Sequence, residues 1–232
     1  MTSDNISQAE LLELRSRFLC LSTPEVSDAL EYYGPAKGMK GIRPSCPGVK
    51  MFGPAFTVAK ELNDDPGYRK AADYIDEVPS GHVVAIDNLG LETCTCWGGI
   101  LTAYARKKGL GGTVINGLHR DVEMIRSANY PVFSKGPFMV TGKGRTRLKQ
   151  LNIPITIGGV AVSPGDILFG DDHGLVVIPQ QILPGVLKRA EAVKSTEHEI
   201  LRLVINEGLP LHLARERLRY NDLTMPCPSS TL

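Results

Sequence analysis

The sequence predicts a single α/β domain with a helical segment at each end. Short aliphatic and β-branched runs, such as 82–87 and 113–115, alternate with helix-like periodicity through the middle of the chain. Helical periodicity alone occupies 8–19 and 180–207. A length of 232 residues, with 42% hydrophobic and 22% charged residues, suits one globular domain, and no linker divides the chain into two.

We divide the chain where this pattern changes. The parts are an N-terminal helical segment at 1–20, a central domain at 21–179, a C-terminal helical segment at 180–220 and a disordered tail at 221–232. The tail is assigned to disorder because it holds Pro226, Pro228 and two serines and shows no periodicity.

Two helices are expected first. One covers 8–19. The second begins at Ser22-Thr23-Pro24-Glu25, a capping-box pattern with proline near the first helical position, and ends near Tyr33 before a Gly-Pro step. A loop rich in glycine, proline and lysine follows at 36–50.

The next elements are a strand, a short helix and a second strand. The strand at 52–59 contains a Gly-Pro step, which favours a sheet edge or a strand start. The helix is expected over 68–77, and the second strand, at 82–87, reads as buried. Asp87 and Asn88 close that second strand, at the end where α/β sheets bind ligands, but a turn without ligand contact is the favoured reading.

The stretch from 97 to 121 organises the rest. An amphipathic helix is predicted, ending in basic residues and capped by Gly109, and a buried strand at 113–115 follows. The apolar stripe of the helix consists of Trp97, Ile100, Leu101, Tyr104 and Ala105. Arg120-Asp121 then comes after the strand. We expect Arg120-Asp121 and the Gly98-Gly99 turn to lie at one end of a βαβ-like unit.

The remaining elements are a short helix, a strand-rich region and the C-terminal helices. The short helix carries Val122, Ile125 and Ala128 on its apolar side. Strands punctuated by glycine turns fill 131–179. A long helix then ends at Gly208, and a further helix is expected near 211–219. The Gly-Lys-Gly-Arg run at 142–145 lacks the spacing of a phosphate-binding P-loop, so it is read as a basic turn.

Composition narrows the classes of function. A net charge of +1 gives no strong field for nucleic acid or an anionic membrane surface. No apolar run is long enough to span a bilayer, and no secretory signal is visible, so the expected location is cytoplasmic. The five cysteines are scattered, and Cys94 and Cys96 alone make a weak zinc pattern; buried reduced thiols are the favoured reading.

From the residues alone, the central features have two readings each. Asp121 is a helix N-cap or a ligand for a hard cation such as Mg²⁺. Arg120 is a structural ion-pair partner or a bidentate clamp for a carboxylate. Gly98-Gly99 is a tight turn or an opening that lets a carboxylate reach the free N–H groups of Ile100 and Leu101.

The chain resembles the family that contains regulator of ribonuclease activity A and the 4-hydroxy-4-methyl-2-oxoglutarate aldolases. Gly99, followed by twenty residues and then Arg120-Asp121, carries the resemblance. The further matching segments are TPEVSDAL at 23–30, PVFSKG at 131–136 and VSPGDILFGDDHGLVVIP at 162–179. The resemblance implies a swivelling β/β/α-type core and assembly into homotrimers or hexamers with sites between subunits.

The resemblance also implies roles for single residues. In the resembling aldolases the residue matching Asp121 holds Mg²⁺ or Mn²⁺, partly through water, and the residue matching Arg120 binds the carboxylate and keto oxygen of a pyruvoyl group. Gly98, Gly99 and the N–H groups of Ile100 and Leu101 would complete the substrate site. A glutamate from the C-terminal region of a neighbouring subunit also assists the metal site of the resembling aldolases, and Glu199 is the nearest candidate for it, by its position near the final helix.

The implied function is a divalent-metal-dependent lyase that cleaves a small 2-oxo acid to pyruvate, by aldol cleavage or by decarboxylation of oxaloacetate. The alternatives are a non-catalytic regulatory binding protein of the ribonuclease-regulator type, or different chemistry on the same scaffold. The chain departs from the resembling aldolases at three positions. They often carry an acid where Gly99 stands and an acid where Met124 stands, and many relatives carry aspartate in place of Asn116.

Overall fold

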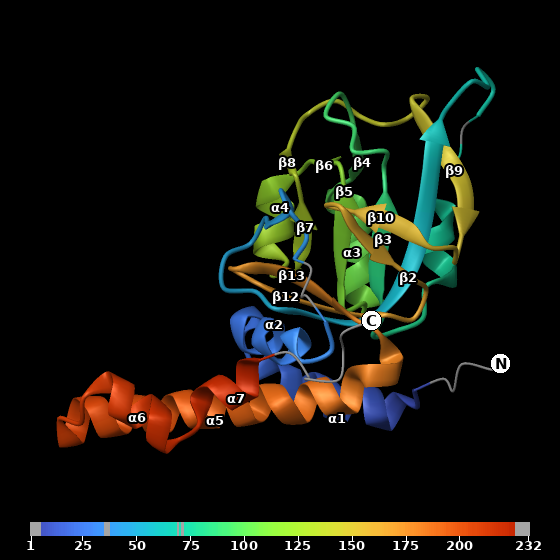
Figure 1. Cartoon of the computed structure of the whole chain (residues 1–232). Coiled ribbons are helices and arrows are strands. Elements are labelled where there is room, and N and C mark those ends of the chain that lie inside the picture. Colours follow the sequence, from blue (N-terminus) through green and yellow to red (C-terminus); the bar gives the residue numbers. More distant parts are fainter. Residues whose placement is uncertain (1–5, 35–37, 69, 71, 226–232) are drawn as a thin grey trace.

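A computed structural model of the chain describes residues 6–34, 38–68, 70 and 72–225 (Figure 1). The helices are α1 (Gln8–Leu19), α2 (Thr23–Glu31), α3 (Gly99–Lys107), α4 (Val122–Ser127), α5 (Leu183–Glu207), α6 (Leu211–Arg217) and α7 (Tyr220–Thr224), with 3₁₀ turns η1 (Asp73–Glu77) and η2 (Gln180–Ile182). The strands are β1 (Arg43–Pro44), β2 (Met51–Leu62), β3 (Val83–Asp87), β4 (Thr95–Trp97), β5 (Gly112–Asn116), β6 (Leu118–His119), β7 (Val132–Ser134), β8 (Gly136–Pro137), β9 (Thr146–Leu151), β10 (Ile155–Ile157), β11 (Val160–Val162), β12 (Ile167–Asp171) and β13 (Gly174–Ile178).

The main sheet is mixed, with strand order β1-β7-β5-β3-β2-β12-β13 and with β9 also pairing to β2. Strands β2, β3, β5 and β7 run parallel, whereas β9, β12 and β13 add antiparallel pairs. The register places Asp87 beside Asn116 at the carboxyl ends of β3 and β5. The predicted strands at 82–87 and 113–115 are therefore confirmed as central strands.

Successive side chains of the parallel strands point to opposite faces of the main sheet, so each face has a hydrophobic core of its own. Val84 and Ile86 of β3 face the cluster that includes residues of α3 and α4, and Val83 and Ala85 face the β10–β11 hairpin. A third cluster joins α1, α2 and the first half of α5 to β12 and β13. The first four of the five β3 residues are completely buried, so the strand reads as a continuous apolar run up to Asp87.

A second, small sheet carries the features on which the site depends. Strands β4, β6 and β8 pair in parallel, in that order. Strand β4 leads into α3 and β6 leads into α4, so the beginnings of both helices come to one edge of this sheet.

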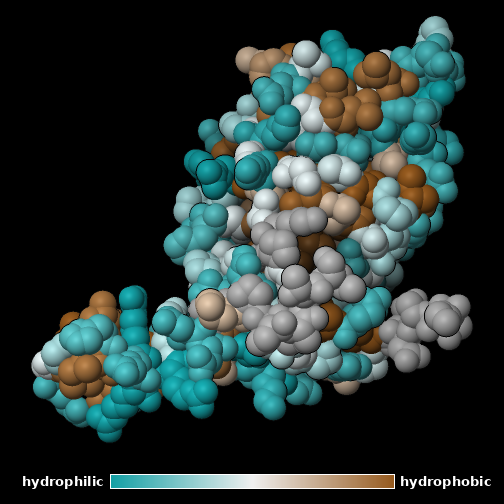
Figure 2. All heavy atoms as spheres, viewed as in Figure 1, coloured by the Kyte–Doolittle hydropathy of each residue, from teal (hydrophilic) through white to brown (hydrophobic). Residues whose placement is uncertain are grey.

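The C-terminal helices form an arm. The outer half of α5 projects from the body, and α6 and α7 fold back along it (Figure 1). Gly208 ends α5 in the left-handed conformation, as predicted, and Ile200, Leu203 and Ala214 hold α6 against α5. Figure 2 shows apolar side chains at the tip of the arm. Leu201 and Ile205 of α5 are exposed.

The Gly-Pro step was expected at a sheet edge or at a strand start, and the second alternative holds. Strand β2 is not an edge strand, because it lies between β3 and β12. Its proline is tolerated at the start of the strand: Pro54 pairs with β12 alone, and pairing with β3 begins only at Ala55. The helix expected over 68–77 is reduced to the 3₁₀ turn η1, and residues 69 and 71 lie outside the described part.

The last expectation concerns the tail. Residues 220–224 form α7, which packs on α5 and α2, so the predicted disorder from 221 onwards is wrong for its first residues. Residues 226–232 lie outside the described part of the chain. Within the described ranges, no helix is both long enough and apolar enough to cross a bilayer.

Candidate functional site

The parallel pairing of β4 and β6 brings the two glycines and the Arg-Asp step together. Trp97 and His119 are register partners, so the residues that follow them leave the small sheet side by side. The backbone N–H of Arg120 donates to the carbonyl of Trp97 at 3.0 Å. The residues between Gly99 and Arg120 form α3, β5 and β6, and this path returns the chain to the side of β4. The predicted meeting of Gly98-Gly99 with Arg120-Asp121 is confirmed.

Asp121 caps a helix, but not the helix that it opens. It is the residue before α4, in the left-handed conformation at φ 60°, and its side chain makes no capping bond to α4. Its Oδ2 instead accepts from the N–H of Gly99, the first residue of α3, at 2.8 Å. The same Oδ2 lies 3.7 Å from Nε of Arg120. The left-handed backbone turns the carboxylate away from α4 and towards α3, where an anion suits the helix N-terminus.

Glycine is required at 98 by the closeness of these groups. A Cβ on Gly98 would stand 2.7 Å from Oδ2 of Asp121 and 3.1 Å from Cγ of Arg120. Any side chain there would push the arginine and the aspartate out of their present positions.

At Gly99 the neighbour is Met124. A Cβ there would lie 2.3 Å from the thioether sulfur and 3.2 Å from Cβ of Met124. The space beside residue 99, where the resembling aldolases often carry an acid, is therefore filled by an apolar side chain from α4. Met124 remains 52% exposed.

These residues open onto a cavity of about 470 Å³. Its walls come from the end of β2, η1, β4, the start of α3, the Arg120-Asp121 step and the turn at 141–146. The charged lining residues are Lys60, Lys70, Arg120 and Lys143 against Asp73, Asp76 and Asp121, four cations and three anions. The volume is within the usual range for small-molecule sites, and the excess of positive charge favours an anionic ligand.

The predicted apolar stripe of α3 was partly wrong. Trp97 belongs to β4, where its Nε1 donates to Oγ1 of Thr102 at 2.9 Å, and Ile100 is 82% exposed. The face that α3 buries carries Thr102 and Ala105. Gly98 breaks the periodicity between Trp97 and the helix, so Ile100 and Tyr104 turn towards the cavity.

The start of α3 offers hydrogen-bond donors to that cavity. The N–H of Gly99 is taken by Asp121, whereas those of Ile100 and Leu101 have no acceptor among the residues that the structure describes. All three residues line the cavity. Free N–H groups at a helix N-terminus bind carboxylates and phosphates.

Two cavity residues were missed by the sequence reading. Lys60, near the end of β2, is 7% exposed, and Cys96 of β4 is half-buried. Burial raises the pKa of the Cys96 thiol to about 11, so it is a neutral thiol at pH 7. The feature of the sequence that could have pointed to Lys60 is its place as the first charged residue after a long apolar stretch of β2.

A buried histidine supports the Arg-Asp step from behind. His119 is 1% exposed, its Nε2 lies 2.9 Å from Oγ of Ser45, and its Nδ1 lies 2.7 Å from Oγ of Ser134. Burial lowers the pKa of His119 to about 4, and the charge of Arg126 acts in the same direction. His119 is therefore neutral at pH 7. Its two hydrogen bonds hold the backbone in place directly before Arg120.

This histidine gives a pH-dependent stability. The unfolded chain has a histidine pKa near 6.5, so between pH 6.5 and 4 the unfolded state binds more protons than the folded state. The free energy of unfolding should fall as the pH drops through that window, by up to about 3 kcal/mol. Thermal melts of wild type and His119→Asn over this range check the prediction. Melting temperatures that fall equally with pH in the two proteins would contradict the prediction. Burial also lowers the pKa of His82, but His82 is present in both proteins and therefore cancels in the comparison.

The residues present fit a weakly held, water-rich divalent cation. Within the described residues no three His, Cys, Asp or Glu side chains gather as a metal site. One carboxylate that leaves most of the coordination sphere to water and substrate oxygen suits Mg²⁺ or Mn²⁺ rather than Zn²⁺. Asp121 meets this need, because Oδ1 has no protein partner within the described part of the chain.

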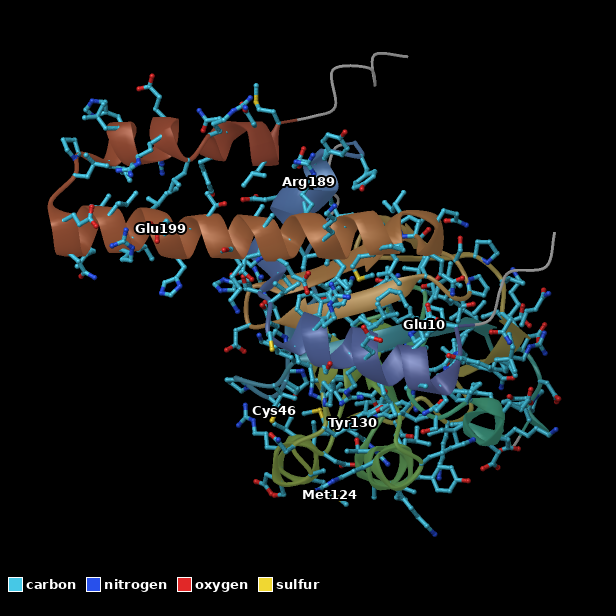
Figure 3. All side chains as sticks on the ribbon, turned by 90° about the horizontal axis from the view of Figure 1, so that it is seen from below. Glu10, Cys46, Met124, Tyr130, Arg189 and Glu199 are labelled. Atoms are coloured by element: carbon cyan, nitrogen blue, oxygen red, sulfur yellow. The ribbon has the colours of Figure 1, made fainter. Side chains whose placement is uncertain are left out.

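Glu199, an expected participant, and Asn116, a departure from the relatives, both lie away from the cavity of their own chain. Glu199 is on the projecting half of α5, paired to Arg202 at 2.8 Å, whereas Met124 is on the opposite side of the molecule (Figure 3). A role for Glu199 at a neighbouring subunit's site stays a prediction. Asn116 donates to Oδ1 of Asp87 at 2.9 Å and does not line the cavity.

Comparison with known proteins identifies the family. The family model described as RraA-like, Aldolase/RraA, matches residues 23–177. The chain belongs to this family. The matched region covers the main sheet, the small sheet and the cavity, and it lies within the central domain expected at 21–179.

The curated relatives of the chain bear different names. The chain is 39% identical to protein DlpA of Legionella pneumophila over 94% of its own length, but it spans only 36% of that relative. A protein of Halalkalibacterium halodurans, provisionally named a 4-hydroxy-4-methyl-2-oxoglutarate aldolase, is 29% identical over 92% of this chain and 98% of its own length.

Solved structures confirm the expected Aldolase/RraA fold. An uncharacterised protein of Pseudomonas syringae pv. tomato matches with a TM-score of 0.81 and 39% identity, over 92% of this chain and all of the other. Streptomyces coelicolor RraAS2, described as an unusual member of the RNase ES inhibitor RraA family, matches with a TM-score of 0.72 and 25% identity, over 80% of this chain and 94% of the other.

Proposed function

We propose that the chain is a divalent-metal-dependent lyase that cleaves a small 2-oxo acid to pyruvate. The observation that carries the proposal is the meeting of Arg120, Asp121 and the free N–H groups of α3 at one cavity. A carboxylate-binding helix end, an arginine fork and a hard anionic ligand are the parts needed to bind a 2-oxo acid and to stabilise an enolate. Provisional aldolase names among the relatives support the same class.

In this proposal the substrate carboxylate accepts from the N–H groups of Ile100 and Leu101. Arg120 lies beside it and donates to the keto oxygen. A metal ion held by Asp121, with Glu199 of a neighbouring subunit as a further ligand, would supply electrophilic polarisation of the keto group. Asp121 in turn keeps Arg120 oriented, since the two side chains are 3.7 Å apart.

The bond that breaks lies between C3 and C4 of the substrate. Its electron pair moves into the enolate of pyruvate, where the Arg120 guanidinium stabilises the negative oxygen. A proton then returns to C3. Decarboxylation of oxaloacetate releases carbon dioxide and requires only this proton, whereas aldol cleavage also requires a base to remove the C4 hydroxyl proton. Because Met124 occupies the space beside Gly99, decarboxylation is the reaction to assay first.

The test is pyruvate release from oxaloacetate, followed with lactate dehydrogenase, in Mg²⁺ or Mn²⁺ and again in EDTA. We expect turnover that saturates with substrate and disappears in EDTA. Blanks hold the same metal concentration without protein, because free divalent cations also polarise oxaloacetate. The same assay is repeated with 4-hydroxy-4-methyl-2-oxoglutarate. A rate equal to the metal blank for both acids would reject the lyase.

A second candidate is a non-catalytic regulatory binding protein. The filled space beside Gly99 favours it, because no acid handles protons there, and one structural relative is described as a member of a ribonuclease-inhibitor family. Different chemistry on the same scaffold is the third outcome that the assay leaves open. In all three cases we expect a homotrimer or homohexamer, which sedimentation equilibrium measures directly.

A further inference from the structure

Tyr104 and Asp76 form a hydrogen-bonded pair on the wall of the cavity. The phenol hydroxyl of Tyr104 donates to Oδ1 of Asp76, and both residues line the cavity together with Arg120 and Asp121. Asp76 lies in the 3₁₀ turn η1 and is exposed, whereas Tyr104 lies in α3 and is 40% exposed. The pair therefore joins η1 to the helix whose N-terminus binds the substrate carboxylate in the proposed function.

The turn η1 is attached to α3 at a second point. The ammonium of Lys108, the C-cap of α3, donates to the carbonyl of Ile75 at 3.0 Å and to the carbonyl of Asp76. Asp76 is thus held by its backbone at the end of α3 and by its side chain at Tyr104. Its second carboxylate oxygen, Oδ2, accepts no hydrogen bond from the residues that the structure describes, so this oxygen is available to a ligand.

Three carboxylates line the cavity within the described part of the chain, those of Asp73, Asp76 and Asp121. Asp121 accepts from the N–H of Gly99 and is the proposed metal ligand. The carboxylate of Asp73 makes no hydrogen bond or ion pair with a described residue, so nothing fixes its direction. Asp76 is the cavity carboxylate that is both held in place and open to a proton from a ligand.

The position of Tyr104 on α3 relates Asp76 to the bound substrate. Tyr104 follows Ile100 by one helical turn, and both residues line the cavity. Four residues of helix rise about 6 Å, and helical side chains lean back towards the N-terminus. A short 2-oxo acid whose carboxylate is bound at the N–H of Ile100 can therefore extend along this wall towards Asp76.

We propose that Asp76 is the general base of aldol cleavage at this cavity and that Tyr104 positions its carboxylate. The proposal rests on the proposed function, which supplies the substrate and its first contacts. Oδ2 of Asp76 accepts the proton of the C4 hydroxyl, and the O–H electron pair forms the carbonyl of the released fragment. The C3–C4 bond breaks, its electron pair passes into the pyruvate enolate, and the proton then moves from Asp76 to C3. The base comes from η1, so it does not depend on an acid at position 99.

Two substrates separate this base from the rest of the site. Cleavage of 4-hydroxy-4-methyl-2-oxoglutarate requires it. Decarboxylation of oxaloacetate does not, because no hydroxyl is deprotonated and C3 takes its proton from water. Asp76→Asn should lower kcat for the aldol substrate by about 10²–10⁴ and change kcat for oxaloacetate by less than about twofold. The amide oxygen of asparagine still accepts from Tyr104, so the melting temperature should not change.

Two further variants test the assignment. Asp73→Asn is the matched control, because it removes another exposed carboxylate from the same turn and the same cavity, and it should leave both reactions unchanged. Tyr104→Phe should lower kcat for the aldol substrate by about tenfold, the effect of one hydrogen bond to a charged group, with little change in KM. This loss should again be confined to the aldol substrate, which a general disturbance of the cavity would not produce.

The outcomes distinguish this inference from the proposed function. Decarboxylation by wild type without aldol cleavage would keep the lyase and overturn the role of Asp76. Wild-type aldol turnover in Asp76→Asn, or equal losses for the two substrates, would also overturn it. Loss of aldol cleavage in Asp73→Asn, with normal turnover in Asp76→Asn, would assign the base to Asp73. Turnover of neither acid by wild type would reject the lyase and the base together.

Discussion

Arg120→Lys is expected to lower kcat for pyruvate release by about 10²–10³, equivalent to about 3–4 kcal/mol of activation free energy. Lysine keeps the positive charge but loses the planar fork that donates to a carboxylate and an adjacent oxygen together. The loss should be larger in kcat than in binding, because negative charge on the keto oxygen is greatest in the transition state. Steady-state kinetics and thermal melts on one preparation measure both effects.

Arg106→Lys is the matched control for this experiment. Arg106 lies in the last turn of the same helix α3, is exposed, and does not line the cavity. It should leave kcat unchanged. Near-normal turnover by a stably folded Arg120→Lys protein would rule out the clamp. A lower melting temperature with unchanged kcat per folded molecule would show that Arg120 is structural.

Asp121→Asn is expected to weaken Mn²⁺ binding by about 100-fold or more with little change in fold. The amide oxygen of asparagine still accepts from the N–H of Gly99, so the cap on α3 survives. The anionic attraction for a hard cation is lost. Calorimetric titration gives the affinity, and circular dichroism with thermal melting gives the fold.

The control for Asp121→Asn is Glu123→Gln, which removes one exposed carboxylate from the neighbouring α4. It should bind Mn²⁺ as wild type does. Wild-type affinity in Asp121→Asn would mean that Asp121 serves only as the cap of α3. Asp121→Ala removes both functions and should also lower the melting temperature, since the loss of a helix cap costs about 1 kcal/mol.

The strands and the core of the site were predictable because local patterns determined them. The aliphatic run at 82–87 and the β-branched run at 113–115 predict buried strands, and both are central in the main sheet. The meeting of Gly99 with Asp121 followed from one helix and one strand between them. Asp121 as the cap of α3 was not visible, because nothing local indicates that φ is positive there.

What the sequence could not show depends on contacts between distant segments. Trp97 fits a helical stripe by spacing, yet pairing with β6 makes it part of a strand. Pro54 suggests a sheet edge or a strand start, and only the strand pairing decides for the start, because β3 and β9 pair with the later part of β2. Lys60 resembles a solvated residue at the end of a strand. Its burial arises because β4, η1 and the turn at 141–146 close around the cavity.

Gly99 and Met124 lie on different helices but are in contact, so a substitution at either position changes which residues the other position can accept. A side chain introduced at 99 would collide with the Met124 thioether, which lies 2.3 Å from the place of a Cβ. Shortening Met124 first is the easier step, because that side chain is half exposed and little buried contact is lost. A lineage that moves between the glycine form and an acidic form of this site would therefore change position 124 before position 99. The reverse order requires the flexible Met124 thioether to rotate away and still leaves the Cβ of residue 99 at 3.2 Å from Cβ of Met124.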